Sequence, residues 1–88
     1  MENIGERIKT ILADEIEVDI NNIHDDSKLV DLGVDSLTFL EMVAEFKDEF
    51  NVNISINEIS EYLKDHPIRT AGELIKYVEE VILKETKT

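Results

Sequence analysis

The sequence has 88 residues, which is the length of one small domain. Apolar residues make up 42% and charged residues 34%, a balance typical of a folded globular domain rather than a disordered chain. Without cysteine, the chain has no disulfide, no thiol nucleophile and no thiolate metal site. Its 21 acidic and 9 basic residues give a net charge of −12, which repels nucleic acid and attracts basic surfaces of other proteins.

No apolar run approaches the roughly 20 residues that a membrane span needs, so stable membrane insertion is not expected. The N-terminal residues show no signal-peptide pattern. These features predict a monomeric protein of the cytoplasm that has no nucleic-acid partner.

The first predicted helix carries a clean apolar stripe, and Asn3 and Glu6 can form a capping box at its start. The stripe consists of Ile4, Ile8, Ile11, Leu12 and Ile16. Residues 17–35 follow as a loop that is long for a domain of this size. Its apolar residues can attach it to the core; they are Val18, Ile20, Ile23, Leu29 and Leu32.

Three more helices are predicted from the same periodicity. The second spans about residues 36–50, and the third is short, at about residues 57–65, with Ser55 and Glu58 as a second capping box. The fourth begins at Thr70, with Glu73 three residues later. No hairpin signal or repeat occurs. The predicted fold is therefore all-α: a four-helix bundle of three main helices and one short helix, with a long ordered loop between helices 1 and 2. The domain is expected to span residues 1–85, with residues 86–88 as a frayed tail.

Ser36 stands at the start of the second helix, within "GVDSLTFLEMVAEF". A serine there can cap the helix, but Asp35 is an equally good cap and leaves the Ser36 hydroxyl facing water. A hydrolase nucleophile would need a base and an orienting group, and only His24 and His66 are available in a chain too small for a substrate cleft. Covalent attachment remains, because a helix N-terminus favours a phosphate group.

The acidic stretch from Asp19 to Asp26 does not fit a calcium loop. Counted from Asp19, the sixth position is His24 instead of glycine, and the twelfth is Val30 instead of glutamate. No specific metal site is predicted.

The segment "DLGVDSLTFLEMVAEFKDEFNVNIS" resembles the serine region of acyl carrier proteins, and the resemblance extends over nearly the whole chain. The family motif falls on Asp31, Gly33, Asp35, Ser36 and Leu37. The resemblance implies that Ser36 receives 4′-phosphopantetheine from coenzyme A through a phosphopantetheinyl transferase. It further implies that the arm carries acyl groups as thioesters, and that the protein is a carrier rather than an enzyme.

Helical periodicity also predicts a docking face. If the second helix turns Phe39, Val43 and Phe46 towards the core, its opposite side is apolar next to the serine and acidic around it. The predicted docking residues are Leu37, Leu40, Glu41, Ala44, Glu45 and Asp48. Expected partners are the transferase and acyl-transfer, condensing or acyl-activating enzymes with basic docking patches. Lys47 interrupts the acidic face, Thr38 replaces a frequent acid of the family, and Phe39 is larger than usual there.

An acyl chain is expected to enter the aliphatic core between the second and third helices. The predicted acyl pocket consists of Val43, Phe46, Phe50, Ile54, Ile59, Leu63 and Ile75. Fatty acid biosynthesis or a related specialised acyl pathway is the predicted service. The alternatives are a discrete polyketide, peptidyl or D-alanyl carrier and, in a different class, an unmodified acidic helical interaction module.

Overall fold

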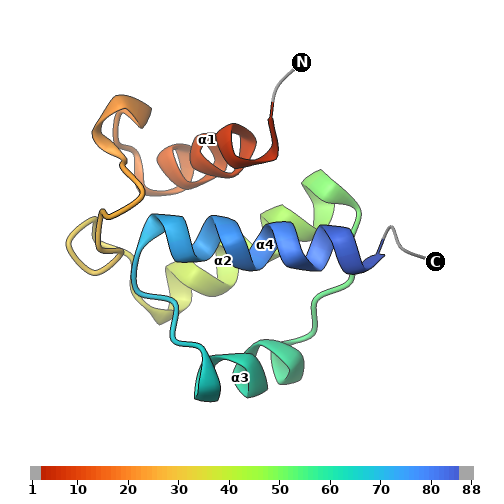
Figure 1. Ribbon diagram of the computed structural model, residues 1–88. Coiled ribbons are helices and arrows are strands. Elements are labelled where there is room, and N and C mark those ends of the chain that lie inside the picture. Colours follow the sequence, from red (N-terminus) through yellow and green to blue (C-terminus); the bar gives the residue numbers. More distant parts are fainter. Residues whose placement is uncertain (1–2, 86–88) are drawn as a thin grey trace.

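The computed structural model describes residues 3–85 and shows four helices in the predicted order (Figure 1). Helix α1 spans Ile4–Ile16, α2 spans Ser36–Phe50, α3 spans Ile56–Asp65 and α4 spans Ala71–Glu85. A 3₁₀ turn, η1, covers Ile20–Asn22 within the long loop. The all-α prediction is confirmed, although the 3₁₀ turn was not foreseen. The tail predicted at residues 86–88 lies outside the described residues.

The predicted capping residues bond to backbone N–H groups at the start of their helices. Asn3 accepts a hydrogen bond from the Glu6 backbone N–H at 2.9 Å, and Ser55 accepts one from the backbone N–H of Glu58 at 3.1 Å. Thr70 and Glu73 bond each other reciprocally at the start of α4. Two helix boundaries differ by one residue from the prediction. Helix α3 begins at Ile56, directly after its cap, and α4 begins at Ala71 because Thr70 is the capping residue and not part of the helix.

The core forms where α1 packs against α2 and α4, both of which are drawn below it in Figure 1. Its largest fully buried side chains are Phe46, Ile8, Leu12, Met42, Leu74 and Val78. The apolar patterns predicted for the first two helices supply Ile8, Leu12 and Phe46, and the other three lie on α2 and α4. Tyr77 on α4 is also buried, and its ring centroid lies 4.6 Å from that of Tyr62. No helix within residues 3–85 is long and apolar enough to cross a membrane.

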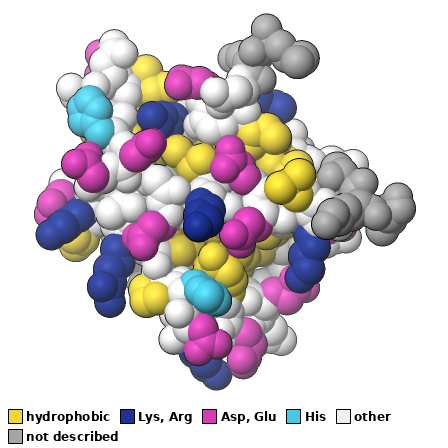
Figure 2. Space-filling model, viewed as in Figure 1, with side chains coloured by type: hydrophobic (Ala, Val, Ile, Leu, Met, Phe, Trp, Pro, Cys, Tyr) yellow, Lys and Arg dark blue, Asp and Glu magenta, His cyan; other side chains and the backbone are white. Residues whose placement is uncertain are grey.

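Arg7 connects the N-terminal end of α1 to the C-terminal end of α2. Its guanidinium pairs with the Glu49 carboxylate and lies 4.7 Å from the centre of the Phe50 ring. Acidic side chains are spread over the face seen in Figure 2, with basic and hydrophobic side chains between them.

The long loop is ordered because its backbone is bonded to the segment that precedes α4. Leu29 N–H donates to the Arg69 carbonyl at 2.9 Å, Ala71 N–H donates to the Ser27 carbonyl at 2.9 Å, and an isolated antiparallel bridge pairs Lys28 with Thr70. The side chains of Ile23 and Leu29 are buried in the core. We call the backbone pairing of residues 25–29 with residues 69–72 the loop clamp.

Gly72 is the residue that lets the loop clamp close. Its N–H donates to the Asp25 carbonyl at 2.8 Å, and a Cβ at position 72 would lie 2.8 Å from that same oxygen. A contact this short with backbone cannot be relieved by rotating a side chain. The loop would have to move.

We expect Gly72→Ala to destabilise the protein, although alanine is ordinarily the better helix residue by about 1 kcal/mol. Steric insertion costs about 1–3 kcal/mol, and each kcal/mol lowers Tm by about 4–8 °C in a domain of this size. The measurement is thermal unfolding by circular dichroism. Gly5→Ala is the control, since its added Cβ meets the Asn3 side chain at 3.2 Å and not backbone. If both variants melt alike, the close approach at Gly72 does not limit stability.

Candidate functional site

A tight turn at residues 29–34 leads the chain into α2. Leu32 N–H and Val34 N–H both donate to the Leu29 carbonyl, at 3.1 and 3.0 Å, and Gly33 N–H donates to the Val30 carbonyl at 3.2 Å. Gly33 has φ +90°, a left-handed conformation that side-chain-bearing residues rarely adopt. The motif glycine therefore has a physical role, which is to turn the loop so that α2 can begin two residues after Val34.

Asp35 is the N-cap of α2, as predicted, and Ser36 is the first residue of the helix. The Asp35 carboxylate accepts a hydrogen bond from the Thr38 backbone N–H at 2.8 Å. Ser36 is exposed, and within residues 3–85 no hydrogen bond engages its side chain. With the capping role taken by Asp35, the Ser36 hydroxyl stands free in water at the positive end of a 15-residue helix.

Hydrogen bonding to the ionised form lowers the pKa of Asp35 below its ordinary value. The largest cause is the Thr38 backbone N–H, followed by the Thr38 side chain. The pKa of Glu73 is also lowered, chiefly by the backbone N–H groups of Arg69 and Thr70, which its carboxylate accepts at 2.8 and 3.0 Å. Both carboxylates therefore favour the ionised form, in which they accept hydrogen bonds from backbone N–H groups at the starts of α2 and α4.

An open groove of about 1230 Å³ contains Ser36 and is lined mainly by apolar side chains. We call it the Ser36 groove. The long loop forms one wall with Leu29, Val30 and Val34. Helix α2 contributes Phe39 and Leu40, and α3 contributes Ile56, Ile59 and Leu63. Ile68, Arg69 and Thr70, from the segment before α4, also line it.

The predicted acyl pocket is distributed over several places in the fold. Ile59 and Leu63 line the Ser36 groove. Val43, Phe46 and Ile54 are buried in the core. Phe50 is half-buried beneath Arg7, and Ile75 faces a separate hollow beside Gly5. The pocket as named stays a prediction, and the groove also contains apolar residues that were not part of the predicted acyl pocket: Leu29, Val30, Val34, Phe39, Leu40, Ile56 and Ile68.

All six predicted docking residues lie on the exposed side of α2. Leu37 is 67% exposed and Leu40 is 40% exposed, and Glu41, Ala44, Glu45 and Asp48 are exposed as well. Lys47 is exposed among them. The structure therefore leaves this face of α2 accessible, while its role in docking remains a prediction.

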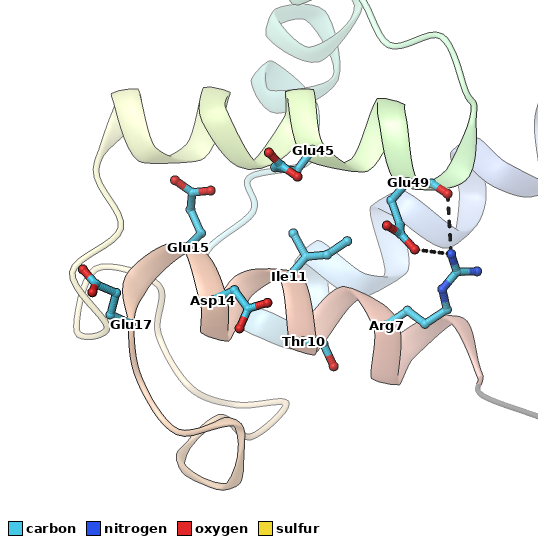
Figure 3. A pocket seen from close by; sticks show the side chains of 8 residues that line it. All are labelled: Arg7, Thr10, Ile11, Asp14, Glu15, Glu17, Glu45 and Glu49. Carbon is cyan, nitrogen blue, oxygen red and sulfur yellow. Dashed lines mark hydrogen bonds and ion pairs between the residues drawn. The ribbon is translucent and has the colours of Figure 1, made fainter.

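A second hollow, of about 570 Å³, lies between α1 and α2 and is strongly acidic (Figure 3). Figure 3 shows Glu15 rising from α1 towards α2, where Glu45 lies, while the Arg7–Glu49 pair closes one end. Asp14 and Glu17 add two further carboxylates. Among residues 3–85 no group of histidine, aspartate or glutamate side chains is arranged to hold a metal ion. The carboxylates that line this hollow add to the negative charge beside the exposed face of α2.

The histidines weighed as catalytic bases do not line the groove that contains Ser36. His24 is an exposed loop residue whose backbone N–H donates to the Ser27 hydroxyl at 2.9 Å. His66 ends α3, and its ring lies 4.8 Å from that of Tyr62. Asp19, the first position tested for a calcium loop, caps the 3₁₀ turn instead.

Comparison with known proteins identifies the class of this domain. A family model described as a phosphopantetheine attachment site matches residues 6–78. The fold and this match define a phosphopantetheine-dependent carrier domain. An acyl carrier protein of Thermotoga maritima is 30% identical over 79 residues, covering 89% of this chain and 90% of that protein.

Two further relatives agree. An acyl carrier protein of Sinorhizobium fredii is 34% identical over 80 residues, covering 90% of this chain and 95% of that protein. A segment of 3-methylorcinaldehyde synthase from Phoma sp. is 41% identical over 59 residues, which is 67% of this chain but 2% of the synthase. The chain belongs to the acyl carrier protein family, and its cofactor is covalently attached 4′-phosphopantetheine.

The residues around the groove fit this cofactor. An exposed, unbonded hydroxyl is available for a phosphodiester, the start of α2 favours the negative charge of that phosphodiester, and an apolar groove opens beside it.

The ionised Asp35 cap should make stability depend on pH in the acid range. Because its folded-state pKa is lowered, its contribution is present above the unfolded-state value of about 4 and is lost as pH falls towards the folded value. We expect Asp35→Asn, which keeps a capping oxygen but cannot titrate, to lose less Tm than wild type between pH 5 and about pH 2.5. Asp48→Asn, on the exposed side of the same helix, is the control. Parallel Tm–pH curves for Asp35→Asn and wild type would contradict this assignment.

Proposed function

We propose that Ser36 is the residue that carries 4′-phosphopantetheine, and that the chain uses this arm to hold acyl groups and present them to separate enzymes. The observation that supports this most strongly is the free Ser36 hydroxyl at the start of α2, opening onto an apolar groove. The other serines differ: the Ser27 hydroxyl accepts a bond from His24 N–H, Ser55 caps α3, and Ser60 lies within α3.

Loading in this proposal is a phosphoryl-type transfer in which the Ser36 oxygen replaces a phosphate oxygen. The Ser36 Oγ forms a bond to the phosphorus that bears the pantetheine of coenzyme A, and the pyrophosphate bond breaks. Adenosine 3′,5′-bisphosphate leaves, and a base of the transferase accepts the hydroxyl proton. Helix α2 contributes the field at its N-terminus, which stabilises the product phosphodiester.

When bound, the cofactor supplies a thiol that carries an acyl group as a thioester. The chain's own residues act on the cargo by sheltering it, since Ile59, Leu63 and Phe39 present apolar surface in the groove beside Ser36. We propose that the chain is a carrier and not itself a catalyst, and that cargo is released only to an enzyme that draws it out of the groove.

We propose further that the exposed face of α2 is the docking surface. Leu37, Leu40 and Ala44 supply apolar contacts, and Glu41, Glu45 and Asp48 supply negative charge for partners with basic patches. The partners are a phosphopantetheinyl transferase and acyl-transfer, condensing or acyl-activating enzymes. The proposed setting is the cytoplasm, and the proposed service is fatty acid biosynthesis or a related specialised acyl pathway.

A carrier that serves one dedicated synthase is the second candidate. The observation that favours it is the 41% identity to a segment of 3-methylorcinaldehyde synthase, higher than the identity to the two free-standing acyl carrier proteins. Mass spectrometry of the cargo on protein isolated from its native cell separates the two candidates.

Ser36→Ala should abolish modification. Incubated with coenzyme A and a broad-specificity phosphopantetheinyl transferase, the wild-type protein should gain the mass of one phosphopantetheine group, and the variant should gain none. Ser60→Ala is the matched control, because Ser60 is an exposed serine that borders the same groove. Intact-protein mass spectrometry with peptide mapping gives the result. A modified Ser36→Ala protein, or an unmodified wild type, would refute the assignment of Ser36.

An octanoyl cargo should raise the Tm of the loaded protein above that of the unacylated holo protein. Each buried methylene contributes about 0.8 kcal/mol before the cost of ordering the chain. A net gain of about 1 kcal/mol would raise Tm by about 4–8 °C. Calorimetry on matched holo and octanoyl samples measures the gain. The acyl-dependent gain should fall in Leu63→Asp, because Leu63 lines the Ser36 groove.

The control for Leu63→Asp is Leu83→Asp on α4, where the side chain is 63% exposed and does not line the groove. Each variant is compared with its own unacylated form, so a general loss of stability cancels. An unchanged gain in Leu63→Asp would place the cargo outside the groove.

A further inference from the structure

A third hollow, of about 690 Å³, lies between α3 and α4, and we call it the α3–α4 groove. It shares no lining residue with the Ser36 groove and none with the exposed docking face of α2. Helix α3 separates the two grooves, because Ile59 and Leu63 line the Ser36 groove while Glu58 and Tyr62 line this one. A molecule bound in the α3–α4 groove would therefore leave Ser36 accessible.

The floor of the α3–α4 groove is aromatic. Tyr62 of α3 and Tyr77 of α4 both line it, and their ring centroids are 4.6 Å apart. Tyr77 is buried and Tyr62 is half-buried, so Tyr62 presents part of its ring to the groove. The ring of His66 lies 4.8 Å from that of Tyr62. Packed rings such as these are already ordered, so a ligand that contacts them pays little to immobilise them.

Acidic side chains frame this aromatic floor. Glu58 and Glu61 of α3 and Glu80 of α4 line the groove and are exposed. Glu61 pairs with Lys64 at 3.2 Å, whereas among residues 3–85 no ion pair engages Glu58 or Glu80.

The tyrosines lie within the negative field of these carboxylates. Burial is the largest cause that raises the pKa of each ring hydroxyl, and the next is the charge of Glu80 for Tyr62 and of Glu58 for Tyr77. Helices α3 and α4 thus direct unpaired negative charge at the same pair of rings.

This combination of groups selects the occupant. A guanidinium stacks on an aromatic face and pairs with a carboxylate through its fork of N–H groups, so arginine satisfies both features at once. A second copy of this chain is disfavoured, since a net charge of −12 makes copies repel one another. Nucleic acid and anionic lipid are repelled for the same reason. The groove therefore fits a basic segment of another protein.

We propose that the α3–α4 groove is a second protein-docking site that accepts an arginine-bearing segment of a partner, with the guanidinium stacked on Tyr62 and paired with Glu58 or Glu80. Because α3 separates this site from Ser36, the partner remains bound while an enzyme acts at the Ser36 groove. The site would thus hold the carrier beside a protein that does not itself handle the cargo.

The test titrates ¹⁵N-labelled protein with a short capped peptide in which arginine residues are spaced between leucine and alanine, and with the same peptide carrying lysine instead of arginine. NMR shifts should concentrate at Tyr62, Tyr77 and Val81, and the arginine peptide should bind more tightly. Glu58→Gln combined with Glu80→Gln should weaken binding of the arginine peptide by about 5-fold or more.

The matched control is Asp14→Asn combined with Glu17→Gln, which removes the same amount of negative charge from the hollow between α1 and α2. It should weaken binding far less than the groove variant. Tyr62→Leu keeps an apolar side chain but removes the ring, so it should abolish the preference for arginine over lysine. Circular dichroism melts check that Tyr62→Leu folds, and the two charge variants carry the test if it does not.

Equal losses in the two charge variants would show general charge attraction only and would overturn the inference. Shifts centred on the exposed face of α2, or on the acidic hollow between α1 and α2, would overturn it as well. So would a wild-type dimer in analytical ultracentrifugation that Tyr62→Leu dissociates, because the groove would then belong to a second copy. These outcomes are independent of whether Ser36 is modified.

Discussion

The loop clamp is the constraint on which the Ser36 groove depends. Three backbone hydrogen bonds join residues 25–29 to residues 69–72, and Gly72 permits the approach because it has no Cβ. The clamp fixes the loop that supplies Leu29 and Val34 to one wall of the groove, and it also fixes Thr70 at the start of α4. A second constraint then acts further along the same loop, where Gly33 turns the chain into α2 and Asp35 takes the capping role. Together they leave the Ser36 hydroxyl free.

Local sequence signals predicted the helices well, because caps and apolar stripes are properties of residues three or four positions apart. Asn3, Asp35 and Ser55 cap the helices that they were predicted to cap. The 3₁₀ turn, the loop clamp and the burial of Tyr77 were not predicted, because each depends on contacts between distant segments. The exposure of Ser36 and of one face of α2 could be predicted from motif and periodicity alone, but the groove could not. Its walls come from the loop, α2, α3 and the segment before α4, which only the fold brings together.

The contrast between Val43 and Ile59 shows the limit of apolarity as a guide. Both belong to the predicted acyl pocket and both are buried, yet Val43 packs within the core while Ile59 lines the groove. A sequence pattern shows that a residue faces inward, but not whether the space beside it is filled. In the opposite direction, Val30 and Ile56 have the apolarity of core residues and are exposed. Exposure of this kind is visible only once the chain is folded.

A small domain gains little from placing apolar side chains in water, since its buried surface is already a modest fraction of the total. Val30, Leu37, Leu40 and Ile56 are exposed near Ser36, so their side chains add little to the stability of the fold. The net charge of −12 opposes self-association through these exposed apolar side chains, because like charges repel. A partner with basic groups around an apolar face would instead be attracted at long range and would bury the exposed apolar side chains at contact. In the proposed function, charge would act first, at long range, and the exposed apolar side chains would act only at contact.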